Sequence, residues 1–218
     1  MSTIPADATT VRPRTATKPL LVAGALAAPL FATASLAQAF TRAGFDLTRH
    51  PLSMLSTGDL GWLQITTFVL TGALMIAGAA GLRRMLASRW APRLLTVTGT
   101  GMIVAGIFTM DPGDGFPAGT PAGPGTTLSW HAGLHLAAGT VSFAALIAAC
   151  FVLARQLAGR GVRIASLVAG TALLAGNVWA MAGGRAGSLT LAIGVIAAMA
   201  WISALHGRLL AADPAQRS

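Results

Sequence analysis

The sequence predicts an all-α fold: an integral membrane bundle of six transmembrane helices with the N and C termini in the cytoplasm. Three observations predict it. Of the 218 residues, 54% are hydrophobic and only 10% are charged, a composition that soluble domains rarely show. Long apolar stretches alternate with short breaks rich in Arg, Gly or Pro. The basic residues are also distributed unevenly between the two sides of the membrane that these stretches imply.

Six apolar stretches are long enough to cross the hydrocarbon core of a bilayer, which takes about 20 residues of α-helix. The breaks between them are rich in Arg at 83–93 and 155–163, in Gly and Pro at 112–125, and in Gly at 183–187. In chain order the predicted spans are 20–40, 61–82, 94–110, 132–154, 164–182 and 188–205. They form one transmembrane domain, 20–206, between a cytoplasmic N-terminal tail, 1–19, and a cytoplasmic C-terminal tail, 207–218.

The first span has a second interpretation. Basic residues precede it, and Ala37, Gln38 and Ala39 resemble a signal-peptidase site, so cleavage there would leave five helices. Its apolar stretch is longer than the ~7–15 residues typical of a signal peptide, which favours a helix that is retained.

The orientation follows from Lys and Arg, because cytoplasmic segments retain positive charge during insertion. Of the fifteen such residues, only Arg42, Arg49 and Arg185 fall on the side opposite the termini. This predicts cytoplasmic termini and a multi-pass protein of the inner (plasma) membrane. It also accounts for the net charge of +9 without a nucleic-acid partner, and membrane lipid is the partner we expect. Lys18 is the only lysine beside fourteen arginines, a bias typical of a GC-rich bacterial source.

The second and third spans align without a gap on the fourth and fifth. The alignment pairs Gly99 with Gly170 and, on the outer side, Gln64 with His135. Two interpretations stay open: a parallel repeat of two helical hairpins, as some transporters have, or coincidence in a sequence rich in Ala, Gly and Leu.

Several motifs resemble those of a known family. They are His50-Pro51-Leu52-Ser53, Gly61-Trp62 and Phe68-Val69-Leu70-Thr71-Gly72, then Asp111-Pro112, Gly115-Phe116-Pro117 and Gly119-Thr120-Pro121, and finally Trp130-His131 with His135. With these motifs the chain resembles the domain-of-unknown-function 998 family of bacterial and archaeal membrane proteins, from the first span to the last. The resemblance implies a multi-span fold. The family brings no established reaction, so it implies no catalytic role for any residue.

Polar residues gather in the outer halves of the predicted spans. Polar side chains inside a bilayer cost free energy, so their presence there indicates a function. We therefore expect an outward-facing polar pocket. Its candidate ligand-binding residues are Gln38, Gln64, Asp111, His131, His135 and Asn177. The proline-rich break at 112–125 is expected to form a stiff lid over this pocket.

His131 and His135 are four residues apart at the start of the fourth span, so both imidazoles lie on one helix face. Such a pair can ligate one divalent metal such as zinc, with Asp111 as a third ligand; Asp114, Asp59 and His50 are alternatives for that place. The alternative is that the two imidazoles make ordinary hydrogen bonds at the membrane interface. His206, near the predicted cytoplasmic end, is expected to be solvated or to lie among the lipid headgroups.

The sequence leaves open whether the chain is an enzyme. Because no complete catalytic constellation is present, we expect a non-enzymatic membrane component that binds a lipid or small molecule. One alternative is a transporter or proton-coupled carrier, based on the repeat and on histidines that titrate near neutral pH. The other is an outward-facing metal-dependent membrane hydrolase.

Overall fold

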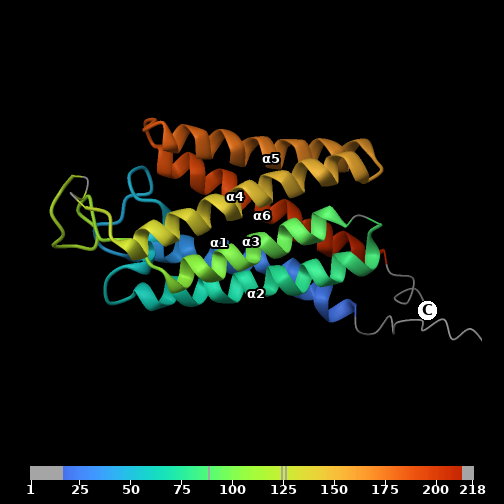
Figure 1. The fold of residues 1–218 in the computed structure, drawn as a ribbon, viewed down its shortest axis with the longest axis horizontal. Coiled ribbons are helices and arrows are strands. Elements are labelled where there is room, and N and C mark those ends of the chain that lie inside the picture. The colour runs from blue at the N-terminus through green and yellow to red at the C-terminus, as the bar shows by residue number, and fades with distance from the viewer. Residues whose placement is uncertain (1–16, 88, 124, 126, 213–218) are drawn as a thin grey trace, which may run out of the picture.

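The computed structural model describes residues 17–87, 89–123, 125 and 127–212, which form six α-helices, one short 3-10 helix and no strand (Figure 1). The elements are α1 (Lys18–Thr41), η2 (Leu52–Ser56), α2 (Gly61–Met85), α3 (Trp90–Ile107), α4 (Trp130–Gln156), α5 (Arg160–Met181) and α6 (Gly187–Ala211). The all-α fold class is confirmed, and each of the predicted spans overlaps one of these helices.

Five of the helices in the described part of the chain, α1, α2, α4, α5 and α6, are long and apolar enough to cross a membrane. This composition supports a multi-pass membrane protein. The remaining helix, α3, is the shortest, with 18 residues, and its first turn holds Pro92 and Arg93. The predicted third span, 94–110, is displaced from it, since α3 ends at Ile107 and the chain is extended at Phe108.

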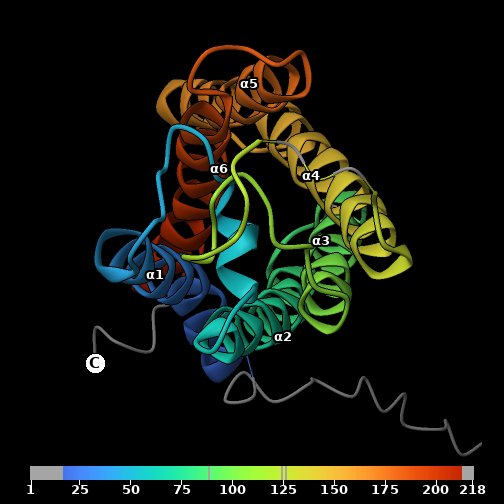
Figure 2. The same ribbon diagram turned by 90° about the vertical axis from the view of Figure 1, so that its left-hand side faces the viewer.

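The helices form a closed ring (Figure 2). Each packs against its neighbours in the chain, and α6 returns to pack against α1. The short helix η2 lies inside the ring at one end, against α1 and α2, and buries Leu52, Met54 and Leu55. A ring of this size leaves a central space that the side chains of six helices must fill or line.

The two ends of the ring differ in composition (Figure 1). The loop end carries the segments 42–60 and 108–129 together with the α5–α6 turn, and it holds all four Asp residues that the structure describes. The arginine end carries the α2–α3 and α4–α5 turns, with arginines in the last turns of α2 and α4.

Glycines bring neighbouring helices into backbone contact. A Cβ on Gly99 of α3 would meet the carbonyl oxygen of Gly72 of α2 at 2.6 Å, and a Cβ on Gly194 of α6 would meet that of Ala172 of α5 at 2.8 Å. In lipid, where no hydrophobic effect drives helices together, such close approach supplies the dispersion contacts that hold them.

Candidate functional site: a cavity inside the helix ring

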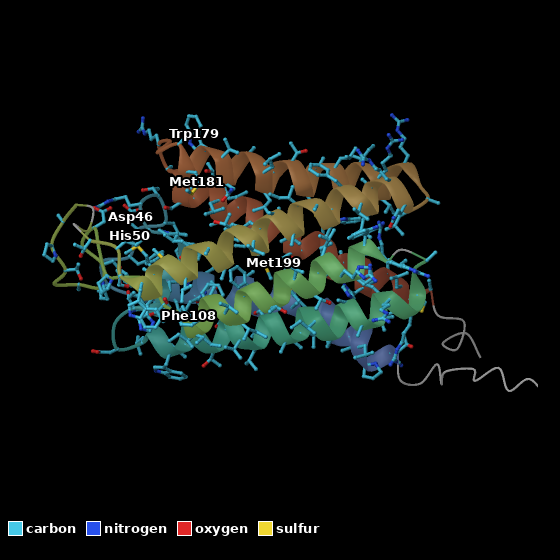
Figure 3. All side chains as sticks on the ribbon, in the orientation of Figure 1. Asp46, His50, Phe108, Trp179, Met181 and Met199 are labelled. Carbon is cyan, nitrogen blue, oxygen red and sulfur yellow. The ribbon has the colours of Figure 1, made fainter. Side chains whose placement is uncertain are left out.

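A cavity of about 270 Å³ lies inside the ring and extends from its middle to the loop end. All six α-helices contribute residues to its wall. Most of the wall is apolar: Phe31, Phe68, Met102, Leu146, Val195 and Met199 all line it. Figure 3 shows Met199 near the middle of the bundle. This lining differs from the polar pocket that the sequence predicts, since most of its larger side chains are hydrocarbon or thioether.

Several hydroxyl groups on the wall are already bonded to backbone. The Ser142 hydroxyl donates to the carbonyl of Thr98 at 2.8 Å, the Thr98 hydroxyl to Leu94 at 3.0 Å, and the Thr140 hydroxyl to Leu136 at 2.8 Å. Such bonds use the single donor of each hydroxyl. These residues therefore add little free hydrogen-bonding capacity to the cavity.

At the loop end, Pro51, Leu52 and Ser53 of the first long loop cover the cavity. The described residues of the segment 112–125, predicted as a lid, do not line it. That segment packs on the first loop instead, with Phe116 buried against Phe45 at a centroid distance of 5.0 Å. Helix η2 and the residue before it therefore take the place expected of the lid.

The cavity reaches the outer surface of the ring on one side. Leu136 of α4 and Met181 of α5 both line it, yet 43% and 78% of their surfaces are exposed. These two helices meet at their turn and diverge toward the loop end (Figure 1), and Met181 lies at the end of α5 (Figure 3). From these exposed lining residues we infer a lateral opening between α4 and α5.

Among the predicted site residues, His135 and Asn177 line this cavity. The His135 Nδ1 atom lies 2.8 Å from the carbonyl oxygens of Ala105 and Phe108. Carbonyls only accept hydrogen bonds, so Nδ1 carries the proton. The ring is only 5% exposed, and Nε2 is its remaining polar atom. The α3 backbone thus fixes the ring and leaves an acceptor on the cavity wall.

Gln38 and Gln64 lie together, but between α1 and α2 rather than on the cavity wall. The Gln64 Oε1 atom accepts from Gln38 Nε2 at 2.9 Å and from the Ser35 hydroxyl at 3.2 Å. Gln64 Nε2 lies 3.0 Å from the same hydroxyl, and Gln64 is fully buried. These three side chains form an interhelical polar cluster, which holds α1 against α2.

Asp111 and His131 lie apart from the cavity. Both carboxylate oxygens of Asp111 accept hydrogen bonds from Ser129, from its hydroxyl at 2.6 Å and its backbone N–H at 2.8 Å. Ser129 in turn caps α4. His131 is exposed, with its ring 3.6 Å from that of Trp130 between centroids. Within the described residues, no group of three or more His, Cys, Asp or Glu side chains is arranged to hold a metal ion.

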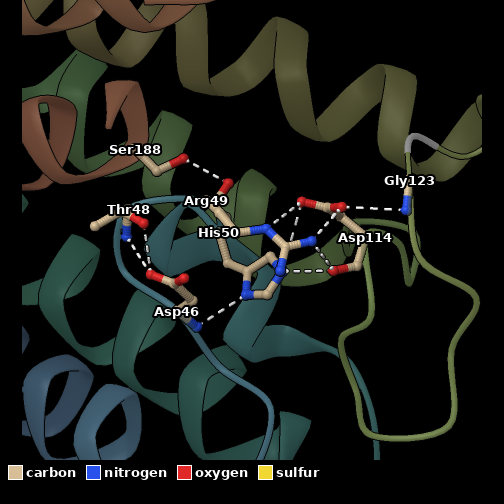
Figure 4. Close-up of polar contacts among 7 residues, drawn as sticks. All are labelled: Asp46, Thr48, Arg49, His50, Asp114, Gly123 and Ser188. Atoms are coloured by element: carbon tan, nitrogen blue, oxygen red, sulfur yellow. Dashed lines mark hydrogen bonds and ion pairs between the residues drawn. The ribbon is translucent and has the colours of Figure 1, made fainter. Parts of the chain in front are cut away.

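A network of polar contacts joins the segments of the loop end (Figure 4). Arg49 donates to both carboxylate oxygens of Asp114, from Nε at 3.1 Å and Nη2 at 2.6 Å. These bonds hold the pKa of the Asp114 carboxyl below its ordinary value. The Ser188 hydroxyl at the start of α6 donates to the Arg49 carbonyl at 2.9 Å. We call Arg49, His50, Asp114 and Ser188 the loop-end network.

His50 is almost fully buried in this network, at 1% exposure. Its Nδ1 atom accepts from the Asp46 backbone N–H at 2.9 Å, so the proton is on Nε2, which donates to the Asp114 carbonyl at 3.0 Å. Beside it, Arg42 donates to the carbonyls of Leu55 and Thr57 at the end of η2. Burial lowers the pKa of the Arg42 guanidinium. Sequence reasoning considered His50 and Asp114 only as possible metal ligands and missed this network, because it joins three segments that are far apart in the chain.

His206 corrects the sequence analysis. It is 1% exposed rather than solvated, and its Nδ1 atom lies 2.7 Å from the Ile202 carbonyl. Its ring fits between helices only because Gly24 of α1 and Gly78 of α2 have no side chains there. The Gly78 backbone lies beside Nε2, but Nε2 has no hydrogen-bond partner among the described residues. A buried imidazole therefore lies between the helices in the half of the ring nearer the arginine end.

Comparison with known proteins gives one family. The family model described as "Protein of unknown function (DUF998)" matches residues 25–207, which include most of α1 and all of α2 to α5. No curated protein and no solved structure matches the chain.

Proposed function

We propose that the chain, which belongs to the DUF998 family of unknown function, is a membrane protein. It would bind a lipid or another apolar small molecule in the ring cavity. In this proposal it catalyses no reaction. The observation that carries it is the lateral opening of a mostly apolar cavity between α4 and α5.

We propose that all six helices cross the membrane, with the arginine end in the cytoplasm. The ring supports the count: α3 packs between α2 and α4, so it shares the environment of two helices that are long and apolar enough to span. An even number of crossings brings both termini to one side, and the arginine-rich turns favour the cytoplasm for that side. The parallel repeat of α2–α3 and α4–α5 remains part of this proposal, with Gln64 and His135 in matching places.

The cavity volume of about 270 Å³ is close to the lower end of the roughly 300–1,000 Å³ typical of ligand pockets. It suits part of a lipid, such as one acyl chain, while the rest of the molecule stays in the bilayer. His135 Nε2 and the Asn177 amide are the polar groups on the wall best placed to orient a ligand. An apolar ligand would enter from the membrane without crossing the loop-end network.

Gly139 of α4 gives a direct test, because it lines the cavity and a Cβ built there meets nothing within 4 Å. We expect Gly139→Trp to fill the cavity without disturbing a helix contact. Gly133 is the matched control: it lies on the same helix, a Cβ there also meets nothing within 4 Å, and it is not part of the cavity wall.

The experiment uses proteoliposomes that contain a diazirine-bearing phospholipid, with mass spectrometry of the crosslinked peptides. Wild type and Gly133→Trp should be labelled at residues of the cavity wall, and Gly139→Trp should lose this labelling severalfold. Labelling that is unchanged in Gly139→Trp, or lost equally in both variants, would reject the cavity as the binding site.

A transporter is a second candidate, because Met199 lines two cavities. One is the large cavity, and the other is a space of about 10 Å³ beside His206, toward the arginine end. Together they form an interrupted path along the ring, with Met199 as a barrier. If this path conducts protons, Met199→Ala should raise proton flux into dye-loaded proteoliposomes, while Met102→Ala, which borders the large cavity only, should not. Equal flux in wild type and both variants would reject it.

A further inference from the structure

The α4–α5 turn at the arginine end encloses a hollow of about 510 Å³. Arg155 from the last turn of α4, and Arg160 and Arg163 from the first turn of α5, line it together with Ala154, Leu157 and Gly159. All three arginines are exposed. Three arginines therefore line one concave surface, opposite the end of the ring that holds the cavity roof.

No carboxylate compensates this charge within the described residues. The four Asp side chains there, Asp46, Asp59, Asp111 and Asp114, all lie at the loop end, and the ion pairs found involve Asp114 alone. Like charges held close together repel one another. An anion in the hollow would relieve this repulsion, and planar guanidinium groups bind phosphate oxygens with two parallel hydrogen bonds.

The start of α5 also favours an anion in the hollow. Gly159 precedes it with a φ of 103°, and no side chain caps the first turn. The backbone N–H groups of such a turn favour negative charge. Farther along α5, Ile164 and Val168 are 49% and 62% exposed, so apolar side chains lie directly beyond the arginines. A phospholipid with its headgroup at the hollow would place its acyl chains along this face.

We propose that the hollow bounded by Arg155, Arg160 and Arg163 binds a phosphate group. It is carried by an anionic phospholipid of the surrounding leaflet or supplied as inorganic phosphate. The site is separate from the ring cavity and does not depend on what the cavity binds. It would hold the α4–α5 hairpin to the membrane surface, from which α4 and α5 diverge to form the lateral opening.

The test uses the full chain in nanodiscs. The thermal unfolding midpoint and the number of bound lipids by native mass spectrometry are compared between phosphatidylcholine alone and mixtures with phosphatidylglycerol. The variant is Arg155→Gln/Arg160→Gln/Arg163→Gln. The matched control is Arg83→Gln/Arg89→Gln/Arg93→Gln, which removes three arginines around the α2–α3 turn that do not line the hollow. Circular dichroism verifies that every variant is folded.

Phosphatidylglycerol should stabilise wild type and the control, and the Gln variant should bind it about tenfold or more weakly. Replacing the same three residues with Lys keeps the charge and should restore part of the binding. In phosphatidylcholine discs, added inorganic phosphate that stabilises wild type equally well identifies free phosphate as the ligand. Equal losses in the Gln variant and the control, or no effect of either anion on wild type, would overturn the proposal.

Discussion

The Arg49 guanidinium and the Asp114 carboxylate lie 2.6 Å apart and join the two long loops of the structure. Because Ser188 also binds the Arg49 carbonyl, the same arginine connects these loops to α6. The three segments meet beside Pro51, Leu52 and Ser53, which cover the cavity. The loop-end network therefore closes the loop end of the ring, and in the proposed function the lateral opening between α4 and α5 is the route to the cavity.

We expect the loop end to open in acid. The Asp114 pKa is held below its ordinary value of 3.8, mainly by the Arg49 hydrogen bonds, so the ionised form is favoured when the loops are closed. The resulting stabilisation is complete above that ordinary value and is lost as the pH falls through the lower, folded-state pKa. Hydrogen exchange of peptides from 108–129 should therefore accelerate as the pH falls through this window, after correction for the intrinsic rate.

Asp114→Asn should weaken the closure at neutral pH and remove most of this acid dependence. Asp59→Asn is the control, because Asp59 is exposed and takes no part in the contacts of Figure 4. If Asp114→Asn and wild type showed the same change of exchange with pH, the Arg49–Asp114 pair would not be what closes the loops.

A second prediction concerns the contact between Gly24 and His206. A Cβ at Gly24 would meet only atoms of the His206 ring at closest approach, so Gly24→Ala should lower the free energy of unfolding by about 1–3 kcal/mol, as overpacking does. His206→Ala should relieve this clash, making the double variant more stable than the two single effects predict when added. Unfolding of detergent-solubilised protein, followed by near-UV circular dichroism, measures the coupling.

Two glycines serve as controls for that cycle. A Cβ at Gly78 would lie 2.6 Å from the Gly24 Cα as well as near His206, so His206→Ala should rescue Gly78→Ala only in part. Gly207→Ala meets nothing within 4 Å and should be neutral or slightly stabilising. Additive effects of Gly24→Ala and His206→Ala would contradict the close packing of the His206 imidazole against Gly24.

Hydropathy predicts where the helices lie in the sequence, but not which helices pack against each other. The stretches around Gly61 and Trp130 are long and apolar, so their helices follow from length alone. The packing of α6 against α1 depends on contacts between distant residues, such as Gly24 with His206. The position of η2 inside the ring likewise depends on contacts with other parts of the chain. The position of His206 near the predicted cytoplasmic end suggested solvent or lipid headgroups, although two glycines on other helices make room for its burial. Similarly, no spacing in the sequence indicates that Gln38 and Gln64 bond to each other while His135 faces the cavity.

A third prediction concerns the polar cluster between α1 and α2. Gln64→Ala removes the acceptor of both Ser35 and Gln38 and should destabilise the protein by roughly 1–2 kcal/mol. Replacing all three with apolar residues, as Ser35→Ala/Gln38→Leu/Gln64→Leu, should cost less than Gln64→Ala, because no buried polar group is left unpaired. Gln156→Ala, at an exposed position, is the control. A triple variant less stable than Gln64→Ala would show that the cluster contributes net stability beyond satisfying its own polar groups.

The metal prediction is tested by the metal content of purified protein, in wild type and in His131→Ala/His135→Ala. We expect equal content in both, for reasons of geometry. The Asp111 carboxylate is bonded through both oxygens to Ser129, the N-cap residue of α4, so turning it toward an ion would break bonds that hold this cap. A stoichiometric ion present in wild type and lost in the variant would show that this rearrangement occurs. It would also favour the metal-dependent hydrolase over a binding protein, because a bound divalent ion can activate water at neutral pH.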